Sequence, residues 1–576
     1  MKKNVLAFLI ICLLATTALA GNEKKVALVM KALSNPFFIK MEEGARLYAK
    51  KNETPLEVFG VERETEVKRQ IGIIENLISR KYGAIVIAPT DSKKLIPVCK
   101  KALDQGIVVV NIDNPFHKTT MKKMNISIPF VGSDNYQGAS LVGDYLRKKM
   151  KNKGRVLVIE GIRGVENAEL RKKGFIDSVT KNSQIKIIAS ESANWHTDEA
   201  LSLVTKLIQK HAQIDAIFCA NDNMAIGAIQ SLDMFGLSGD IFIGGYDNIE
   251  EVRSEIHNKR MHATVEQHPE MMGEFGVMLA SKRMAGQKIP LLTKTPLDLI
   301  TYDCFDKKIS LSLADGTPFF KSLLDGASQA SSLFGLKLNV SIANNDDAKQ
   351  LIDIQSFIEK KSDIIIINPT HAESVSPAIE LAHAEGIPIM TVDRKSAVPE
   401  KIICHIESNN VAGGQMAAEF IIQKLNQKGK ILEFEGAPGT SAAHDRGKGF
   451  NDVLKQYPDM KIVAREVAFF NRNKAFDAMN HILKKGLDID AIFAHNDEMI
   501  IGAIQALKKL KKTLPVTVGF DAIPEAIERV KKKQLSATIA QDPYKMGFLT
   551  IKQAAQYLQG YSVKPVVLVD LLIIDH

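Results

Sequence analysis

The chain contains one stretch twice, and this repeat limits the possible folds more than any other feature. Ile214–Leu232 and Ile489–Leu507 are identical at fourteen of nineteen aligned positions. Each copy is a short apolar run, then Asn-Asp, then a helix-like pattern that contains glycine. This order predicts a buried strand followed by a helix. Because ligands bind at the carboxyl ends of strands in open α/β sheets, Asn221, Asp222 and their counterparts are candidates for a cleft, with helix capping as the alternative.

The repeat extends over almost the whole sequence. Apolar strand-like runs alternate with helix-like segments from Val26 onward, and the same order of segments begins again at Lys308. Such alternation predicts α/β lobes, each a doubly wound parallel sheet with helices on both faces. Copies of about 275 residues are far longer than solenoid repeats of about 20 to 50 residues. The sequence therefore predicts two tandem domains, residues 21–303 and 304–576, with a junction near Asp303–Lys307.

The first twenty residues resemble an export signal. Lys2 and Lys3 precede an apolar run from Val5 to Leu14, and Ala18-Leu19-Ala20 offers small residues for cleavage after Ala20. This pattern predicts a cleaved signal peptide over residues 1–20, and the run is too short to span a membrane. We expect a periplasmic mature chain that is not inserted in the membrane.

Composition argues against several classes of function. The net charge of +9 is spread over 576 residues, and the lysine runs fall where solvated helix faces are expected. No basic stripe with interleaved aromatic residues appears, so we expect no nucleic-acid partner. The four cysteines after the signal peptide are scattered and lack metal-ligand spacing, so we expect them to be structural and expect no metal or cofactor. They are Cys99, Cys219, Cys304 and Cys404.

Amides, carboxylates and aromatic rings gather at the predicted strand ends in both copies. Planar polar groups suit sugar hydroxyls, and flat rings suit the C–H faces of a sugar. The members recur in the same order, at offsets that drift from 282 to 274. The pairs are Asn35 and Thr317, Asp113 and Asp393, Arg171 and Arg446, Asn221 and Asn496, Asp247 and Asp521, and Gln267 and Gln541. This repetition in two diverged copies predicts a sugar site in each.

The ordered motifs N-P-F-F, I-D-N or V-D-R, N-D-x-M, G-Y/F-D and Q-x-P resemble those of a known family. Both copies are similar to periplasmic sugar-binding proteins of the ribose/allose/galactose type, the substrate-binding components of ABC importers. The resemblance implies the type I periplasmic-binding-protein fold, in which two lobes joined by three crossing strands close over a sugar. The implied crossings lie near Ser133-Asp134, Gln267 and Thr295–Asp298 in the first copy. In the second copy they lie near Ser408-Asn409, Gln541 and Pro565–Val567.

The same resemblance implies the residues that bind sugar. In the first copy these are Asn35, Phe37, Phe38, Asp113, Asn114, Arg171, Trp195, Asn221, Asp247 and Gln267. In the second copy they are Thr317, Phe319, Phe320, Asp393, Arg394, Arg446, Phe470, Asn496, Asp521 and Gln541. The second copy resembles a ribose binder, except that Thr317 stands where ribose binders have Asn. The first copy has Asn114 in place of Arg and Trp195 in place of Phe, which implies a different ligand, such as a hexopyranose.

Other functional interpretations of the sequence are less favoured. A sugar-responsive transcription regulator would need a DNA-binding helix pair where the signal peptide lies. Catalysis is not expected, because no nucleophile elbow appears and the Gly436–Ser441 loop lacks a Gly-Lys-Ser/Thr ending. The expected partner is the membrane permease of an ABC importer. A periplasmic sugar sensor for a histidine kinase or chemoreceptor stays open as the alternative.

Overall fold

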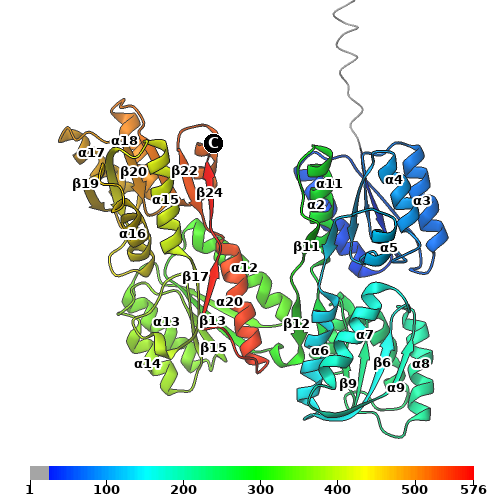
Figure 1. Ribbon diagram of the computed structural model, residues 1–576. Helices are drawn as coiled ribbons and strands as arrows, with labels where there is room; N and C mark the ends of the chain where they lie inside the picture. The colour runs from blue at the N-terminus through cyan, green and yellow to red at the C-terminus, as the bar shows by residue number, and fades with distance from the viewer. Residues whose placement is uncertain (1–24, 576) are drawn as a thin grey trace, which may run out of the picture. The chain divides into compact units, whose positions relative to one another are not determined.

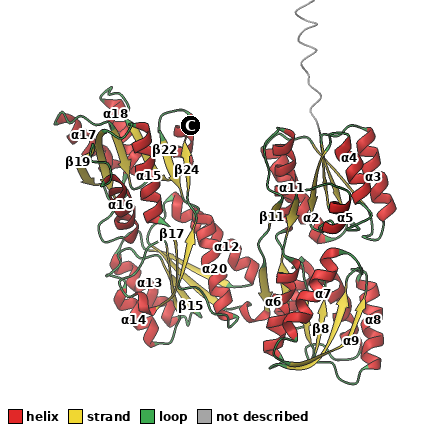
Figure 2. Cartoon of the chain, viewed as in Figure 1, coloured by secondary structure: helices red, strands yellow, loops and turns green. Residues whose placement is uncertain are grey.

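A computed structural model describes residues 25–575, which form two compact units, one ending at Tyr302 and the other beginning at Asp303 (Figure 1). The predicted signal peptide and its cleavage site lie outside the described residues. Among the described helices, none is both long and apolar enough to cross a membrane. Each unit contains two lobes, and in each lobe helices lie on both sides of a central sheet (Figure 2).

The first lobe of unit 1 is a parallel sheet with strand order β11-β5-β4-β3-β1-β2. Its strands are β1 (Val26–Met30), β2 (Leu56–Gly60), β3 (Ala84–Ile87), β4 (Val108–Ile112), β5 (Phe130–Gly132) and β11 (Leu292–Lys294). Its helices are α2 (Pro36–Lys51), α3 (Val67–Ser79), α4 (Ile96–Asp104), α5 (Lys118–Lys123) and α11 (Pro269–Met284). The order of β2, β1, β3, β4 and β5 is that of a doubly wound sheet, with a switch point between β1 and β3.

The second lobe of unit 1 repeats this arrangement with strand order β12-β10-β9-β8-β6-β7, in which β12 is antiparallel to β10. Its strands are β6 (Lys153–Glu160), β7 (Gln184–Ser192), β8 (Ala216–Cys219), β9 (Phe242–Gly244), β10 (Ala263–Glu266) and β12 (Asp298–Thr301). Its helices are α6 (Asn135–Lys149), α7 (Glu166–Val179), α8 (Thr197–Lys210), α9 (Asp222–Met234) and α10 (Glu250–His257). A 3-10 turn, Tyr302–Cys304, follows β12.

Unit 2 has the same topology. Its first sheet contains β13 (Lys308–Leu313), β14 (Lys337–Ile342), β15 (Ile364–Ile367), β16 (Ile389–Val392), β17 (Ile402–Ser408) and β23 (Val566–Val569). Its second sheet contains β18 (Gly429–Glu435), β19 (Met460–Val467), β20 (Ala491–Ala494), β21 (Val516–Asp521), β22 (Ala537–Ala540) and β24 (Leu572–Asp575). Helices α12 (Pro318–Phe334), α13 (Asp347–Glu359), α14 (Ser376–Ala384) and α20 (Pro543–Leu558) belong to the first lobe. Helices α15 (Asn410–Lys424), α16 (Ser441–Leu454), α17 (Arg472–Lys484), α18 (Asp497–Lys509) and α19 (Pro524–Lys531) belong to the second.

Three segments join the two lobes of each unit. In unit 1 they follow β5, β10 and β11, where the family resemblance implies them. In unit 2 the first two follow β17 and β22. The prediction of the third crossing at Pro565–Val567 is wrong. Val566–Val569 is a strand of the first sheet, paired with β17, and the chain crosses at Asp570-Leu571 before β24. Only Asp570 interrupts the apolar run over Val566–Ile574, so a single polar residue marks the break between the two strands.

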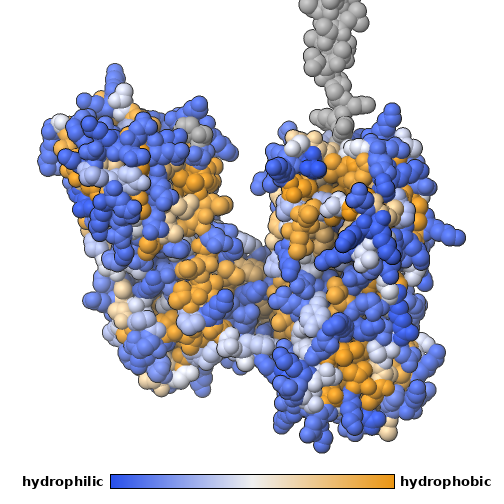
Figure 3. All heavy atoms as spheres, viewed as in Figure 1, coloured by the Kyte–Doolittle hydropathy of each residue, from blue (hydrophilic) through white to orange (hydrophobic). Residues whose placement is uncertain are grey.

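The central strands are apolar because both faces of each sheet are covered. Every residue of β1 and of β15 is fully buried, which explains why these strands read as unbroken apolar runs. On the face shown in Figure 3, hydrophilic residues cover most of the outer surface, with apolar patches between them. The four cysteines of the described residues are buried. These buried sheets place the polar residues of the loops at the strand ends, where the two lobes face each other.

Candidate functional site

In each unit, one arginine of the second lobe is fixed in the cleft by the protein itself. Arg171, on α7, donates from Nε to Asn135 Oδ1 at 2.7 Å and from Nη1 to the Ala220 carbonyl at 2.9 Å. Arg446, on α16, makes the equivalent two bonds in unit 2. Both side chains are buried. The remaining donors of each guanidinium are therefore held in a set orientation toward the space between the lobes.

A carboxyl group and a hinge glutamine lie beside each arginine. Gln267 Nε2 donates to Asp247 Oδ1 at 2.6 Å, and Gln541 Nε2 donates to Asp521 Oδ1 at 2.7 Å. Burial raises the pKa of Asp521 to about 7, against the opposing effect of the nearby arginine. Burial likewise raises the pKa of Asp247 well above its usual range. Both carboxyls therefore hold a proton more readily than an exposed aspartate does.

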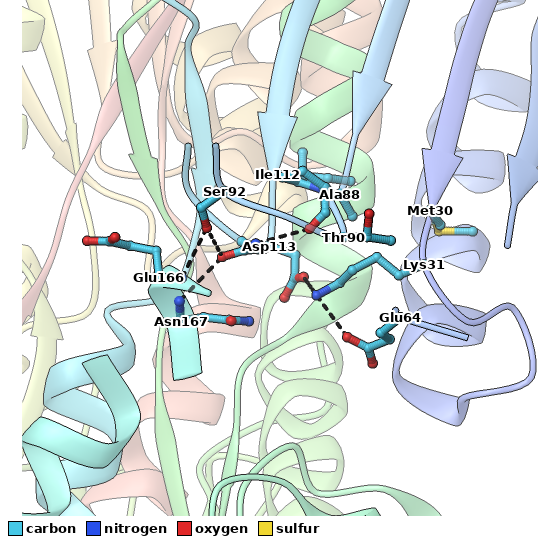
Figure 4. A network of polar contacts seen from close by, with 12 residues as sticks. Met30, Lys31, Glu64, Ala88, Thr90, Ser92, Ile112, Asp113, Glu166 and Asn167 are labelled. Carbon is cyan, nitrogen blue, oxygen red and sulfur yellow. Dashed lines mark hydrogen bonds and ion pairs between the residues drawn. The ribbon is translucent and has the colours of Figure 1, made fainter. Parts of the chain in front are cut away.

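The first lobe of unit 1 contributes a buried cation that the sequence analysis missed (Figure 4). Lys31 Nζ lies 3.0 Å from Asp113 Oδ2 and 3.1 Å from Glu64 Oε2, and only 3% of the lysine side chain is exposed. Burial would lower the pKa of Lys31, but the two carboxylates more than compensate and raise it. The ammonium also lies 5.4 Å from the Phe38 ring centroid. Lys31 therefore stays charged at one wall of the cleft.

The cavity of unit 1 is small, about 20 Å³. Trp195 lines it together with Asn167 and Asn221. Trp195 Nε1 and Asn167 Oδ1 are buried and have no hydrogen-bond partner in the protein. Buried polar atoms normally have partners, so these two atoms are suited to bind a hydroxyl group of a ligand. The expected site residues at this cavity are Asn35, Phe37, Phe38, Asp113, Arg171, Trp195, Asn221 and Asp247.

Two expected residues of unit 1 do not line the cavity. Gln267 is not among the lining residues, but it donates to Asp247, which is one of them, through the bond described above. Asn114 is fully buried; its Nδ2 donates to the Pro89 carbonyl at 3.0 Å, and its Oδ1 accepts from Ser92 Oγ at 3.2 Å. Its Oδ1 also accepts from the Asn167 N–H of the other lobe at 3.3 Å. The structure thus places Asn114 between the lobes rather than at the cavity.

The first lobe of unit 2 presents a carboxylate and a guanidinium side by side. Asp393 Oδ2 accepts from Asn368 Nδ2 at 3.2 Å and lies 3.8 Å from Arg394 Nε. Arg394 Nη1 donates to the Pro369 carbonyl at 3.2 Å, and its guanidinium lies 5.6 Å from the Phe320 ring centroid. Burial raises the pKa of Asp393, with the nearby arginines opposing this effect. This wall therefore carries both an acceptor and a fork of donors.

The cavity of unit 2 is much larger, about 280 Å³. All the expected residues of this unit line it: Thr317, Phe319, Phe320, Asp393, Arg394, Arg446, Phe470, Asn496, Asp521 and Gln541. Gln541 Oε1 is buried without a hydrogen-bond partner in the protein. The two units therefore share the same chemistry at the centre of the cleft and differ in the space around it.

The duplicated Asn-Asp pairs have two separate roles. Asn221 caps α9, since its Oδ1 accepts from the Met224 N–H at 3.0 Å, and it also lines the cavity. Asp222 is fully buried and accepts from the Tyr246 N–H and from Thr264 Oγ1, each at 2.8 Å. The asparagine thus caps the helix as well as lining the cavity, while the aspartate joins the helix to the sheet by hydrogen bonds.

Sequence reasoning missed several residues that line the cavities. In unit 1 these are Lys31, Glu64 and Asn167. In unit 2 they are Asp315, Pro318, Asn345, Ala442, Phe469, Asn471, Arg472, Asn473, Glu498 and Ile523. Lys31 directly follows β1, so its position at a strand end was a usable signal. The others lie in loops or first helical turns, where polar residues are usually solvated.

One group of potential metal ligands occurs among residues 25–575, at the second crossing of unit 1: Glu266, His268 and Glu270. Nε2 of His268 lies 2.7 Å from Asp298 Oδ2, and its Nδ1 lies 3.2 Å from Glu270 Oε1. Burial would lower the pKa of His268, but these carboxylates raise it to about 10. With the imidazole protonated, the group forms a charged network at the second crossing of unit 1.

Comparisons with known proteins agree with this arrangement. The family described as "periplasmic binding protein domain" matches residues 26–288 and 309–562, and the chain belongs to this family. The D-ribose/D-allose-binding protein of Pseudomonas aeruginosa is 39% identical over 50% of this chain and 92% of its own length. The ribose import binding protein of Bacillus subtilis is 39% identical over 45% of this chain and 84% of its own length. The D-allose-binding periplasmic protein of Escherichia coli is 34% identical over 48% of this chain and 90% of its own length.

Proposed function

We propose that the chain is an exported solute-binding protein that captures a monosaccharide in each unit and delivers it to an ABC-type importer. The observation that carries this proposal is the duplicated set of arginine, aspartate and hinge glutamine, which faces aromatic rings from the opposite lobe. Fixed polar groups recognise the hydroxyls of a sugar, and the rings cover its apolar faces.

The charges in the clefts favour a neutral ligand. In unit 1 the cations Lys31 and Arg171 face three carboxyls, and burial favours the protonated form of one of them, Asp247. In unit 2, Arg394 and Arg446 face Asp393 and Asp521 at the centre of the cleft. Since the charges nearly balance within each site, an ionised ligand would leave an unpaired charge in a buried space.

The relatives support import and binding over the alternatives. Their names describe binding proteins for ribose or allose, and one is named as a component of ribose import. We therefore favour delivery to a permease over signalling to a histidine kinase or chemoreceptor, and binding over turnover. Periplasmic location follows from the same proposal, with the predicted signal peptide as the means of export.

Calorimetry on the full chain tests the proposal. D-ribose, D-allose and D-galactose are titrated in turn, with glutamate as a charged control ligand. We expect at least one sugar to bind and the recovered sugar to be chemically unchanged. Small-angle scattering should show a more compact chain with saturating sugar, because only closed lobes satisfy the polar groups of both sides.

Failure of every pentose and hexose to bind would contradict the proposal. Chemical conversion of the bound sugar would contradict the non-enzymatic role. Binding without any change in scattering would contradict lobe closure while leaving sugar recognition intact.

A further inference from the structure

The cavity of unit 2 has an outer part that unit 1 lacks. Its centre is lined by the residues that both units share, but six further polar or aromatic groups line it toward the mouth. They are Asp315 and Asn345 on the first lobe and Phe469, Arg472, Asn473 and Glu498 on the second. A monosaccharide held by the central residues would leave this outer part filled with water.

The loop that contributes Asp315 and Thr317 to this cavity is shorter than its counterpart in unit 1. The segment between the first strand and the first helix runs over Lys31–Asn35 in unit 1 and over Ala314–Thr317 in unit 2, one residue fewer. Leu33 in the longer loop packs on β2, where a Cβ on Gly60 would lie 2.5 Å from Leu33 Cγ. In unit 2 the shorter loop has Gly316 and no side chain equivalent to Leu33. Lys31, which narrows the first cavity, is also absent from the second, since Ala314 follows the equivalent strand.

Phe469 offers an aromatic surface at this mouth. It lines the cavity, yet 48% of the residue is exposed. The ammonium of Lys474 lies 3.9 Å from its ring centroid. Its φ is 54°, in the left-handed region that bulky residues avoid, and the equivalent residue of unit 1 is Asn194, with φ 51°. Asparagine tolerates this conformation better than phenylalanine does, so the ring stands where the backbone favours a smaller residue.

The polar groups around the ring are paired with one another and carry little net charge. Asn345 Nδ2 donates to Asp315 Oδ2 at 2.9 Å, and Arg472 Nε donates to Glu498 Oε2 at 2.7 Å. Each pair keeps further lone pairs or N–H groups for a ligand. A neutral, flat group with hydrogen-bonding edges would fit between these pairs and against the ring.

We propose that the second cleft takes a pentose that carries a neutral planar substituent, the chemistry shared by a nucleoside and an aryl glycoside. The sugar ring occupies the shared central residues, and the substituent stacks on Phe469. This inference rests on the proposed function, because it requires the centre of the cleft to bind a sugar. Unit 1, with Asn194 at the equivalent position, lacks this aromatic surface.

The test compares ligands and variants on the full chain by calorimetry. The probes are D-ribose, methyl β-D-ribofuranoside, phenyl β-D-ribofuranoside and uridine. Since stacking of a planar group on an aromatic side chain contributes roughly tenfold in affinity, we expect a planar riboside to bind about tenfold more tightly than ribose. The phenyl riboside and uridine separate an apolar ring from one with hydrogen-bonding edges, and tighter binding of either supports the proposal.

Phe469→Asn should remove the tighter binding of the planar riboside and leave the affinity for ribose unchanged. Phe469→Tyr should keep the tighter binding of the planar riboside. Val467→Asn is the matched control, because Val467 is also half-exposed and apolar but lines neither cavity. Equal affinity of all four probes, or an unchanged gain in Phe469→Asn, would overturn the inference and leave the proposed function standing. If no probe binds and no other pentose or hexose does, the proposed function itself fails.

Discussion

Asp393 combines burial, an arginine neighbour and a position at the end of β16, so it is the most informative single residue for sugar binding. Sugar hydroxyls would donate to its carboxylate, and Asp393→Ala would leave them unpaired in a buried space. The expected loss is about 1–3 kcal/mol, roughly tenfold or more in affinity. Calorimetry with the preferred sugar of unit 2 measures it. Val467→Asn, at a residue that lines neither cavity, is the control and should leave that affinity unchanged. Wild-type affinity in Asp393→Ala would show that this carboxylate is structural.

The raised pKa of Asp521 predicts that the free energy of unfolding of unit 2 depends on pH. Burial raises its folded-state pKa to about 7, whereas an unfolded aspartate titrates near 4. Between these values the folded unit holds a proton that the unfolded chain releases, so ligand-free stability should fall as pH rises from about 4 to about 7 and then level off. The expected change is a few kcal/mol at most. Thermal unfolding of the full chain across this range, with Asp521→Asn as the comparison, measures it. An identical pH profile for both proteins would contradict the assignment.

At the scale of elements, the lobes are joined by direct contacts that differ between the units. In unit 1 the Glu166 N–H, in the first turn of α7, donates to Ser92 Oγ at 3.0 Å (Figure 4). The next N–H, that of Asn167, donates to Asn114 Oδ1 at 3.3 Å. These contacts are between neutral groups, so they should respond little to salt.

In unit 2 the contact between the lobes includes an ion pair. The Lys395 N–H donates to Ser441 Oγ at 3.0 Å, and its Nζ lies 3.4 Å from Asp445 Oδ2 of α16 and 2.8 Å from Glu407 Oε1. Because 43% of the lysine side chain is exposed, Lys395→Met should weaken sugar binding only about twofold, as expected for an exposed pair. It should also remove the salt dependence of sugar release in stopped-flow measurements. Salt-dependent release that persists in Lys395→Met would show that this ion pair does not stabilise the closed form.

The order of the elements could be predicted from the sequence because apolar runs and helix periodicity are local signals. The duplication also repeats each of these signals in a second copy. The residues at the strand ends, such as Asp247 and Asp521, could be placed for the same reason. The direction of an individual side chain could not. Asn114 lies between the lobes because Pro89 and Ser92 of its own lobe and the Asn167 N–H of the other lobe hydrogen-bond to its side chain there. Lys31 turns inward because Asp113 and Glu64, distant in sequence, compensate its charge.

For the whole molecule, the main question is why one chain carries two clefts. Both units contain the arginine, the aspartate and the hinge glutamine in equivalent contacts, so the same buried polar set is present in each. The walls have diverged: unit 1 has Lys31 and Trp195 around a small cavity, and unit 2 has Arg394 and Phe470 around a larger one. Duplication for avidity alone would not require this divergence.

We therefore predict that the two units bind different sugars and do so independently. Trp195 gives a wider stacking face than Phe470, and the fork of donors of Arg394 has no counterpart in unit 1. Independence follows because each cavity is lined by residues of its own unit, and coupling needs differential contacts between states. A sugar panel on the full chain, on Asp113→Ala and on Asp393→Ala measures both properties. Each variant should lose one set of sugars and keep the other with unchanged affinity. One sugar that binds both sites equally would instead favour duplication for capture rate, and a shift in the intact site would show coupling.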